Sequence, residues 1–417
     1  MTIDFTFTES QSALQAATRD QARRILDDVA EQTRYLPTPE ERFRATRPAY
    51  EQLVSEGLLR KLIPAAVGGE GNGLVDAAII AEELYAGDAS VALTALGSLL
   101  GLLPIALAGN PEQILKALPL FLSGEGAPLA ALCHSEPGGS ANFDAPAPAE
   151  GVRTTARLDG DEWVIDGEKR WVSSATGWDG NGADVLTVVC RTAEDPATPA
   201  DQALSVLLVP GGADGFVDHG AIDMIGHRAH LAPTFAFDNV RVPAGNVVGA
   251  VGIGKALVEG SFAASAALVG IFGVGLMRHA FDYALDFARR EHRAGPHPIV
   301  DYQAVGYALA DAKTAIEAAR WLSYRACHAV DTLEPAALEL AVQAKIFGSE
   351  TAVTVVTDLM RVVGIESYDT DNPLGRLLQD ALALPIFDGG NLGVRRRQLH
   401  QLLSAPEYDP LATITKP

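Results

Sequence analysis

The chain has few cysteines and none of the short motifs that mark common nucleotide or metal enzymes. Its 417 residues include three scattered cysteines, Cys133, Cys190 and Cys327, with no CxxC pair, which predicts a reducing compartment, the cytoplasm. It lacks a complete GxGxxG fingerprint, a Walker A loop, a GxSxG elbow and an HExxH pair. His227 and His230 are spaced HxxH, but strand-like surroundings would point them to opposite faces, so no metal is expected. A dinucleotide would have to bind in some other way.

Positive charge is also scarce. Lys and Arg number 32 against 53 Asp and Glu, a net charge of −21, whose field repels phosphate backbones and anionic lipids. Neither nucleic acid nor a membrane is therefore an expected partner. Residues 1–5 carry no basic or apolar segment typical of a secretion signal. Residues 89–111 and 260–277 lack charged side chains, but their polar residues, glycines and unbiased flanks predict buried core helices.

The pattern of apolar and polar residues changes twice along the chain. Residues 1–130 have helical periodicity, residues 131–248 have short β-rich runs separated by Gly, Pro and Asp turns, and residues 249–417 return to long helices. Apolar residues make up 48% and charged residues 20%, as in a compact protein with a large core. Segregated blocks, without βαβ alternation, predict an α+β fold that is mainly α.

One acid stands in an unusual setting between Leu384 and Gln398. An apolar run leads to Asp388, two glycines follow it, and a basic helical segment comes next. A helix beginning after Gly390 would carry Arg395 about two turns inside it, and helical side chains lean back toward the N-terminus. The helix N-terminus and the guanidinium would both favour a charged carboxylate, which is a plausible base toward an acidic carbon. The ordinary alternative is a helix N-cap.

Two further stretches have the composition of a cofactor site. Residues 133–142 gather hydroxyls and backbone amides in a tight turn, which could bind a polar ring or a phosphate. In residues 167–174, Trp171 and Ser173 are two apart, so on a strand they would share one face and could line a flat cofactor. Taken alone, the first could be an ordinary turn and the second a half-buried strand.

Together these stretches resemble the acyl-CoA dehydrogenase superfamily along nearly the whole chain. Residues 134–140 resemble its TEPxAGS flavin loop and residues 167–173 its GxKxWIT strand, with further matches at 62–69 and 240–243. The resemblance implies FAD and three parts. These are an N-terminal helical domain over 1–130, a middle antiparallel β domain over 131–248, and a C-terminal four-helix bundle domain over 249–417 that carries the catalytic Asp.

The resemblance also implies which residues contact FAD. Within one chain they are Leu132, His134, Ser135, Gly139, Ser140, Trp171, Ser173 and Gly390. Ser173 would contact the reactive edge of the flavin. Arg293 and Gln303 resemble the pair that reaches the FAD of a neighbouring subunit, which implies a homotetramer.

The base separates this chain from most of the superfamily, where a Glu is usual. The Asp at 388 resembles the nitroalkane oxidase branch, as do residues 42–48, 133–142, 177–179, 265–270 and 387–398. That branch implies oxidation of neutral nitroalkanes to aldehydes or ketones, with O2 as electron acceptor and nitrite and hydrogen peroxide as products. Asp388 would be the base, Arg395 its electrostatic partner and Ser265 a nearby hydroxyl. Leu384 stands where a Tyr is expected, which leaves the preferred substrate size open.

Other functions remain compatible with the same fold. One is an acyl-CoA dehydrogenase, another is a flavin-dependent N-oxygenase or nitrososynthase, and a third is a degenerate flavoprotein kept as an assembly subunit. Asp388, Arg395 and the flavin-contact residues are all present, which counts against the last.

Overall fold

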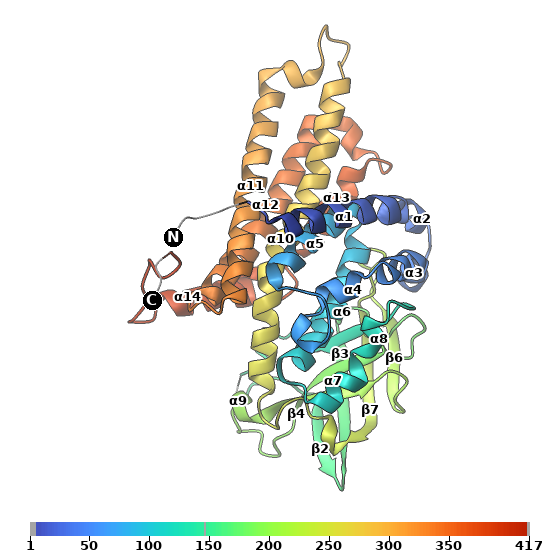
Figure 1. Cartoon of the computed structure of the whole chain (residues 1–417), viewed down its shortest axis with the longest axis vertical. Coiled ribbons are helices and arrows are strands. Elements are labelled where there is room, and N and C mark those ends of the chain that lie inside the picture. Colours follow the sequence, from blue (N-terminus) through green and yellow to red (C-terminus); the bar gives the residue numbers. More distant parts are fainter. Residues whose placement is uncertain (1–5, 146, 415–417) are drawn as a thin grey trace.

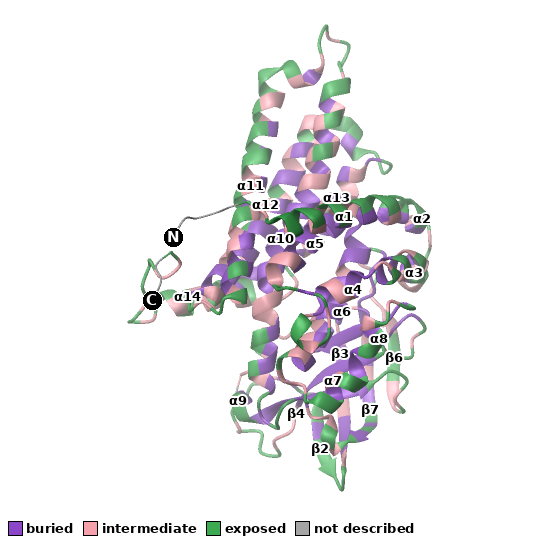
Figure 2. Cartoon of the chain, viewed as in Figure 1, coloured by how far each residue is buried: buried purple, intermediate pink, exposed green. Residues whose placement is uncertain are grey.

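The computed structural model describes residues 6–145 and 147–414, so residues 1–5, where no secretion signal is expected, lie outside it. Figure 1 shows three parts, with a β domain at one end of the molecule, a long helical bundle at the other and the N-terminal helices between them. Figure 2 shows buried residues along the bundle helices and across the sheet. The helical and β regions therefore follow the order expected from the sequence.

The N-terminal part is a set of helices with clear sequence signals at their ends. Thr38 accepts from the backbone of Glu41 (3.2 Å) in a capping box that begins α3, and Gly57, with φ +86°, lies between α3 and α4. Asp88 caps α6 by accepting from two backbone amides at 3.0 Å. The helices are α1 (Glu9–Leu26), α2 (Val29–Thr33), α3 (Pro39–Ser55), α4 (Leu58–Leu62), α5 (Leu74–Gly87), α6 (Ala89–Ala108), α7 (Pro111–Ala117) and α8 (Pro119–Leu122).

The middle part is a seven-stranded sheet in the order β1-β4-β2-β3-β7-β6, with β5 paired to β4. Its strands are β1 (Ala130–Cys133), β2 (Thr155–Asp159), β3 (Glu162–Arg170), β4 (Val185–Arg191), β5 (Leu204–Pro210), β6 (Phe216–Ala221) and β7 (Pro233–Pro243). The expectation of an antiparallel sheet needs one correction, because β4 pairs in parallel with β1 and, at one position, with β2. The long connection between β1 and β4, which contains the β2–β3 hairpin, makes a parallel crossover possible.

The C-terminal part is a bundle of α10 (Gly254–Arg290), α11 (Gln303–Asp331), α12 (Ala337–Val363) and α13 (Pro373–Ala383), followed by a π-helical turn (Asn391–Arg395) and α14 (Arg396–Leu403). Helices α10 and α12 cross where Gly270 meets Gly348. A Cβ on Gly348 would lie 2.7 Å from the Gly270 Cα, so only glycine permits this approach. The sequence reading did not single out α13, although Asn372 caps it and Pro373 is its first residue.

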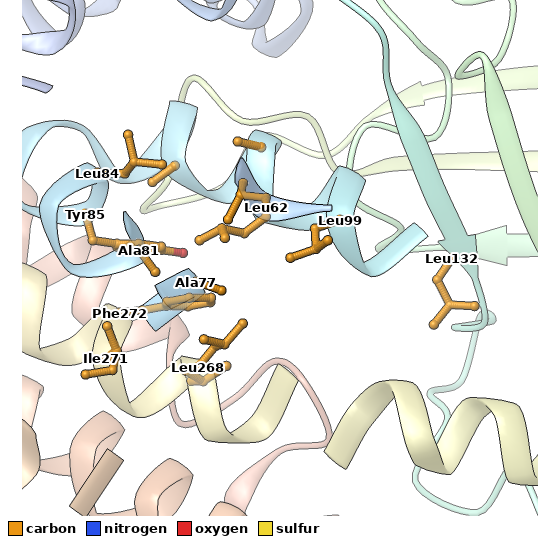
Figure 3. Close-up of a cluster of buried hydrophobic side chains, with 14 of the residues drawn as sticks. Leu62, Ala77, Ala81, Leu84, Tyr85, Leu99, Leu132, Leu268, Ile271 and Phe272 are labelled. Atoms are coloured by element: carbon orange, nitrogen blue, oxygen red, sulfur yellow. The ribbon is translucent and has the colours of Figure 1, made fainter. Parts of the chain in front are cut away.

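A shared hydrophobic core joins the N-terminal helices to α10. Figure 3 shows Leu62, Ala77, Ala81, Leu84, Tyr85, Leu99, Leu132, Leu268, Ile271 and Phe272 in this cluster. Tyr85 stacks on Phe272 with ring centroids 4.4 Å apart. Helices α6 and α10 are long and apolar enough to cross a membrane, yet both are mostly buried inside the protein, as expected for core helices.

Candidate active site

A cavity of about 840 Å³ opens where α6, the sheet, α10 and the loop after α13 meet. Its wall is mainly apolar, with Leu93, Leu96 and Leu100 from α6 and Leu268 and Phe272 from α10. Polar side chains are few and come mostly from loops of the β domain, with Asp388 from the loop after α13. An apolar cavity with a few convergent polar groups is typical of a cofactor or small-molecule site.

Asp388 lies on the wall of this cavity, on a sharp turn that ends the apolar run. Asp388 and Gly389 have φ values of +53° and +69°, a left-handed conformation that Asp and Gly adopt more easily than most residues. The carboxylate Oδ1 accepts from Ser265 Oγ at 2.6 Å, and Oδ2 accepts from Arg395 Nη2 at 2.9 Å. The N-cap position of the following π turn belongs to Gly390, so the capping alternative for Asp388 is wrong.

Arg395 is held over Asp388 by several bonds. Its Nε and Nη2 donate to the Asp388 carbonyl at 3.0 and 2.8 Å, and Nη2 also donates to the Phe262 carbonyl at 3.2 Å. The side chain is 2% exposed and that of Asp388 5%. Arg395 ends a single π turn and does not lie two turns inside a regular helix, so that detail was wrong, although the expected contact forms.

Asp388 has a donor on each carboxylate oxygen and can still accept a further hydrogen. The Ser265 hydroxyl donates to Oδ1, and the Arg395 guanidinium donates to Oδ2. A carboxylate has about four lone-pair sites, and Ser265 and Arg395 occupy one on each oxygen of Asp388. Because Asp388 lines the cavity, a remaining lone pair is open to a bound molecule. This is the geometry of a general base toward a carbon acid.

The residues expected to hold FAD within one chain all line this cavity. They are Leu132, His134, Ser135, Gly139, Ser140, Trp171, Ser173 and Gly390. Nδ1 of His134 is buried without a hydrogen-bond partner among the described residues, so a bound group can satisfy it. Burial and the nearby Lys169 lower the pKa of His134 to about 3, so its ring is neutral. Gly139 has φ +94° beside open space. These features fit a flavin.

The structure does not bring Arg293 and Gln303 to the cavity of their own chain. Both are exposed at the tip of the α10–α11 hairpin, far from the sheet (Figure 1). Arg293 contacts Glu366 at 3.2 Å and the Val363 carbonyl at 2.5 Å, and Gln303 contacts Tyr307. Any contact of this pair with FAD would therefore be to that of another subunit.

Sequence reasoning missed a buried ion pair in the flavin loop. Lys169 Nζ lies 2.9 Å from Glu136 Oε1, and the backbone amides of Arg153 and Thr154 also donate to Glu136, at 2.8 and 2.9 Å. The Thr154 hydroxyl adds a fourth bond of 2.6 Å. Burial alone would raise the pKa of Glu136, but Lys169 and these donors outweigh it and hold the pKa at about 2. The sequence signal for this pair was the presence of Glu136 in the loop at 134–140 and of Lys169 in the stretch at 167–173.

Two other expectations about the cavity change with the structure. His227 and His230 lie in a loop, so the strand-like placement was wrong, and both line the cavity. Within residues 6–145 and 147–414, no group of His, Cys, Asp or Glu could hold a metal ion. Leu384 is fully buried, and the cavity wall in this stretch includes Ala383 and Ile386. The Leu384 side chain is therefore not part of the cavity wall.

Comparison with known proteins agrees with this geometry. Models of the acyl-CoA dehydrogenase N-terminal, middle and C-terminal domains match residues 8–125, 131–240 and 252–403. The chain is 44% identical to nitroalkane oxidase of Podospora anserina over 98% of both chains, and 38% identical to that of Fusarium oxysporum over 98% of this chain and 97% of the relative. A nitroalkane oxidase variant crystallised with 1-nitrooctane superimposes with a TM-score of 0.94 over 99% of each chain at 37% identity. The chain therefore belongs to the nitroalkane oxidase family, within the acyl-CoA dehydrogenase superfamily.

Proposed function

We propose that this protein is an FAD-dependent oxidase of neutral nitroalkanes. The overall reaction consumes the nitroalkane, water and O2, the electron acceptor, and gives an aldehyde or ketone, nitrite and hydrogen peroxide. The observation that carries the proposal is the buried Asp388 at the cavity wall, bonded to Ser265 and Arg395. Two relatives that match nearly the whole chain bear the name nitroalkane oxidase.

The chain supplies the proton transfer and the surroundings for it. A neutral nitroalkane suits the apolar wall, where the leucines of α6 and Phe272 exclude water. The α-carbon proton moves to a free lone pair of Asp388, while Ser265 and Arg395 hold the two carboxylate oxygens in place. When bound, FAD supplies the two-electron oxidation of the resulting carbon and delivers the electrons to O2.

The base itself argues against an acyl-CoA dehydrogenase. Asp388 is one methylene shorter than the Glu expected in such an enzyme, which displaces the carboxylate by about a bond length. A displacement of that size alters which carbon the base can reach. The likeness to dehydrogenases therefore supports the fold, and the likeness to nitroalkane oxidases supports the reaction.

We further propose a homotetramer in the cytoplasm. Arg293 and Gln303 are exposed at the hairpin tip, where they would be available to the FAD of another subunit. Sedimentation of the FAD-replete protein tests this assembly. A tetramer is expected, and an FAD-replete monomer would exclude a role for this pair across subunits.

Anaerobic flavin reduction tests the function itself. The purified protein is expected to be yellow with noncovalent FAD, and nitroethane should bleach the flavin absorbance. A short acyl-CoA and the preformed nitronate of nitroethane are measured in parallel. Bleaching by the acyl-CoA alone would make the protein a dehydrogenase, and a colourless protein that FAD cannot reconstitute would remove the flavoenzyme proposal altogether.

A further inference from the structure

A buried lysine, Lys345, lies behind the Asp388 turn and has no part in the chemistry described above. Lys345, on α12, is fully buried. Its Nζ donates to the Leu384 carbonyl at 3.0 Å and to Asn391 Oδ1 at 2.9 Å. These two acceptors stand on either side of Asp388 in the chain, so one side chain ties together both ends of the turn that carries the base.

Asn391 extends this connection along α12. Its Nδ2 donates to Ser349 Oγ at 3.0 Å and to Glu350 Oε1 at 3.1 Å, and its backbone amide donates to the Pro385 carbonyl at 2.9 Å. The buried amide therefore uses both its oxygen and its nitrogen. A fully bonded buried network has one low-energy arrangement, because any shift leaves a polar group unpaired.

The cost of burying a lysine makes this arrangement informative. An ammonium group removed from water is unfavourable unless its surroundings compensate, and here both close acceptors are neutral carbonyl oxygens. Burial lowers the pKa of Lys345 to about 7, while the charge of Asp388 works against the shift and that of Arg395 works with it. Glu350 is the other charged group that faces it. A neutral amine keeps two N–H donors, enough for both acceptors, so the contacts persist in either protonation state.

We propose that Lys345, acting through Leu384 and Asn391, is the positioning residue that fixes the Asp388 turn at the cavity. The inference rests on the proposed nitroalkane oxidation and adds a determinant of the proton-transfer step. Lys345 does not contact the cavity and acts only through the turn. The base turn has a left-handed Asp388 and a left-handed Gly389, so it needs external support to hold its shape.

The test compares Lys345→Met with wild type on two substrates. Methionine matches the lysine side chain as far as Cε and lacks Nζ, so both donated hydrogen bonds are removed. Displacement of the base by about 1 Å should lower kcat/KM for nitroethane by about 10–100-fold. The nitronate has already lost the α-proton, so its kcat/KM should fall much less. Lys313→Met, at an exposed lysine that pairs with Glu317 on α11, is the matched control and should leave both rates unchanged.

Amide hydrogen exchange over residues 384–391 separates this inference from the proposed function, because it needs no turnover. Faster exchange in Lys345→Met than in wild type would show that Lys345 stabilises the Asp388 turn, even if nitroethane proves not to be the substrate. Wild-type exchange in this segment, or equal losses on nitroethane and nitronate, would overturn the positioning role. If Lys345→Met does not fold, Ser349→Ala tests the same proposal. This variant removes one partner of Asn391 and should give a smaller loss of kcat/KM, confined to nitroethane. Absence of a selective loss on nitroethane would overturn the proposal.

Discussion

Two buried ion pairs in this protein look alike and serve different ends. Glu136 and Lys169 in the β domain are 2.9 Å apart with side chains 5% and 0% exposed, and Asp388 and Arg395 are also 2.9 Å apart with 5% and 2% exposed. Distance and burial do not tell them apart. What differs is how completely each carboxylate is bonded.

The oxygens of Glu136 receive four hydrogen bonds, two from backbone amides, one from a hydroxyl and one from Lys169. Those of Asp388 receive one each, from Ser265 and Arg395. Three of the bonds to Glu136 fall on Oε1 and one on Oε2, where Arg153 Nε also lies at 3.6 Å. A carboxylate surrounded by protein donors in this way holds the structure together. One that accepts a single bond on each oxygen beside a cavity can serve as a base.

The largest effect on activity is expected when Asp388, the acid with fewer hydrogen bonds, is neutralised. Asp388→Asn is nearly isosteric, so bound FAD and the thermal unfolding temperature should stay close to wild type. Steady-state kcat/KM for nitroethane should fall about 10²–10⁴-fold, as is usual when a general base is removed. Loss of FAD binding in this variant would mean that Asp388 supports the fold, as Glu136 does.

Disrupting the Glu136–Lys169 pair should lower the stability of the protein. Lys169→Met removes the buried cation and leaves Glu136 only the partly exposed Arg153, whose Nε lies 3.6 Å from Oε2. This should cost about 3 kcal/mol in the free energy of unfolding, measured by denaturant titration. In wild type the folded pKa of Glu136 is about 2 against an ordinary value of 4.5. The contribution of Glu136 is therefore complete above about pH 4.5 and is lost as pH falls toward 2. A variant with wild-type stability would contradict the structural role.

Arg395→Met sharpens the comparison by removing the cation that contacts Asp388. The variant loses the bond to Oδ2 and the two bonds to the Asp388 carbonyl, so the carboxylate is no longer held at the cavity wall. We expect kcat/KM for nitroethane to fall about 10²-fold, with the preformed nitronate much less affected. Steady-state kinetics with both substrates checks this. Equal losses on the two substrates would show that Arg395 does not act through the base.

Ser265→Ala should have the smallest effect on turnover. It removes one hydrogen bond to a charged oxygen, worth about 1.5–3 kcal/mol, while the bond from Arg395 to the other oxygen remains. Steady-state kinetics should show a loss of about tenfold in kcat/KM for nitroethane, with the nitronate little affected. A loss as large as that of Asp388→Asn would assign Ser265 a direct part in proton transfer.

The contact between Asp388 and Arg395 could be predicted from the sequence, because the two residues are seven apart in the chain and the glycines between them mark a turn. Ser265 is 123 residues from Asp388, so only the family resemblance pointed to it. Lys345 could not be found, because nothing local marks a lysine as buried until α12 packs against a turn 39 residues away. The π turn was also missed, since periodicity does not distinguish it from a regular helix start.

The most direct test of the central claim is the ratio of two rates in Asp388→Asn. Anaerobic flavin reduction is followed by stopped flow with nitroethane and, separately, with its preformed nitronate. If Asp388 removes the α-proton, the nitroethane rate falls by the full 10²–10⁴-fold expected for a lost base while the nitronate rate stays much closer to wild type. Equal losses on both forms would contradict proton abstraction by Asp388.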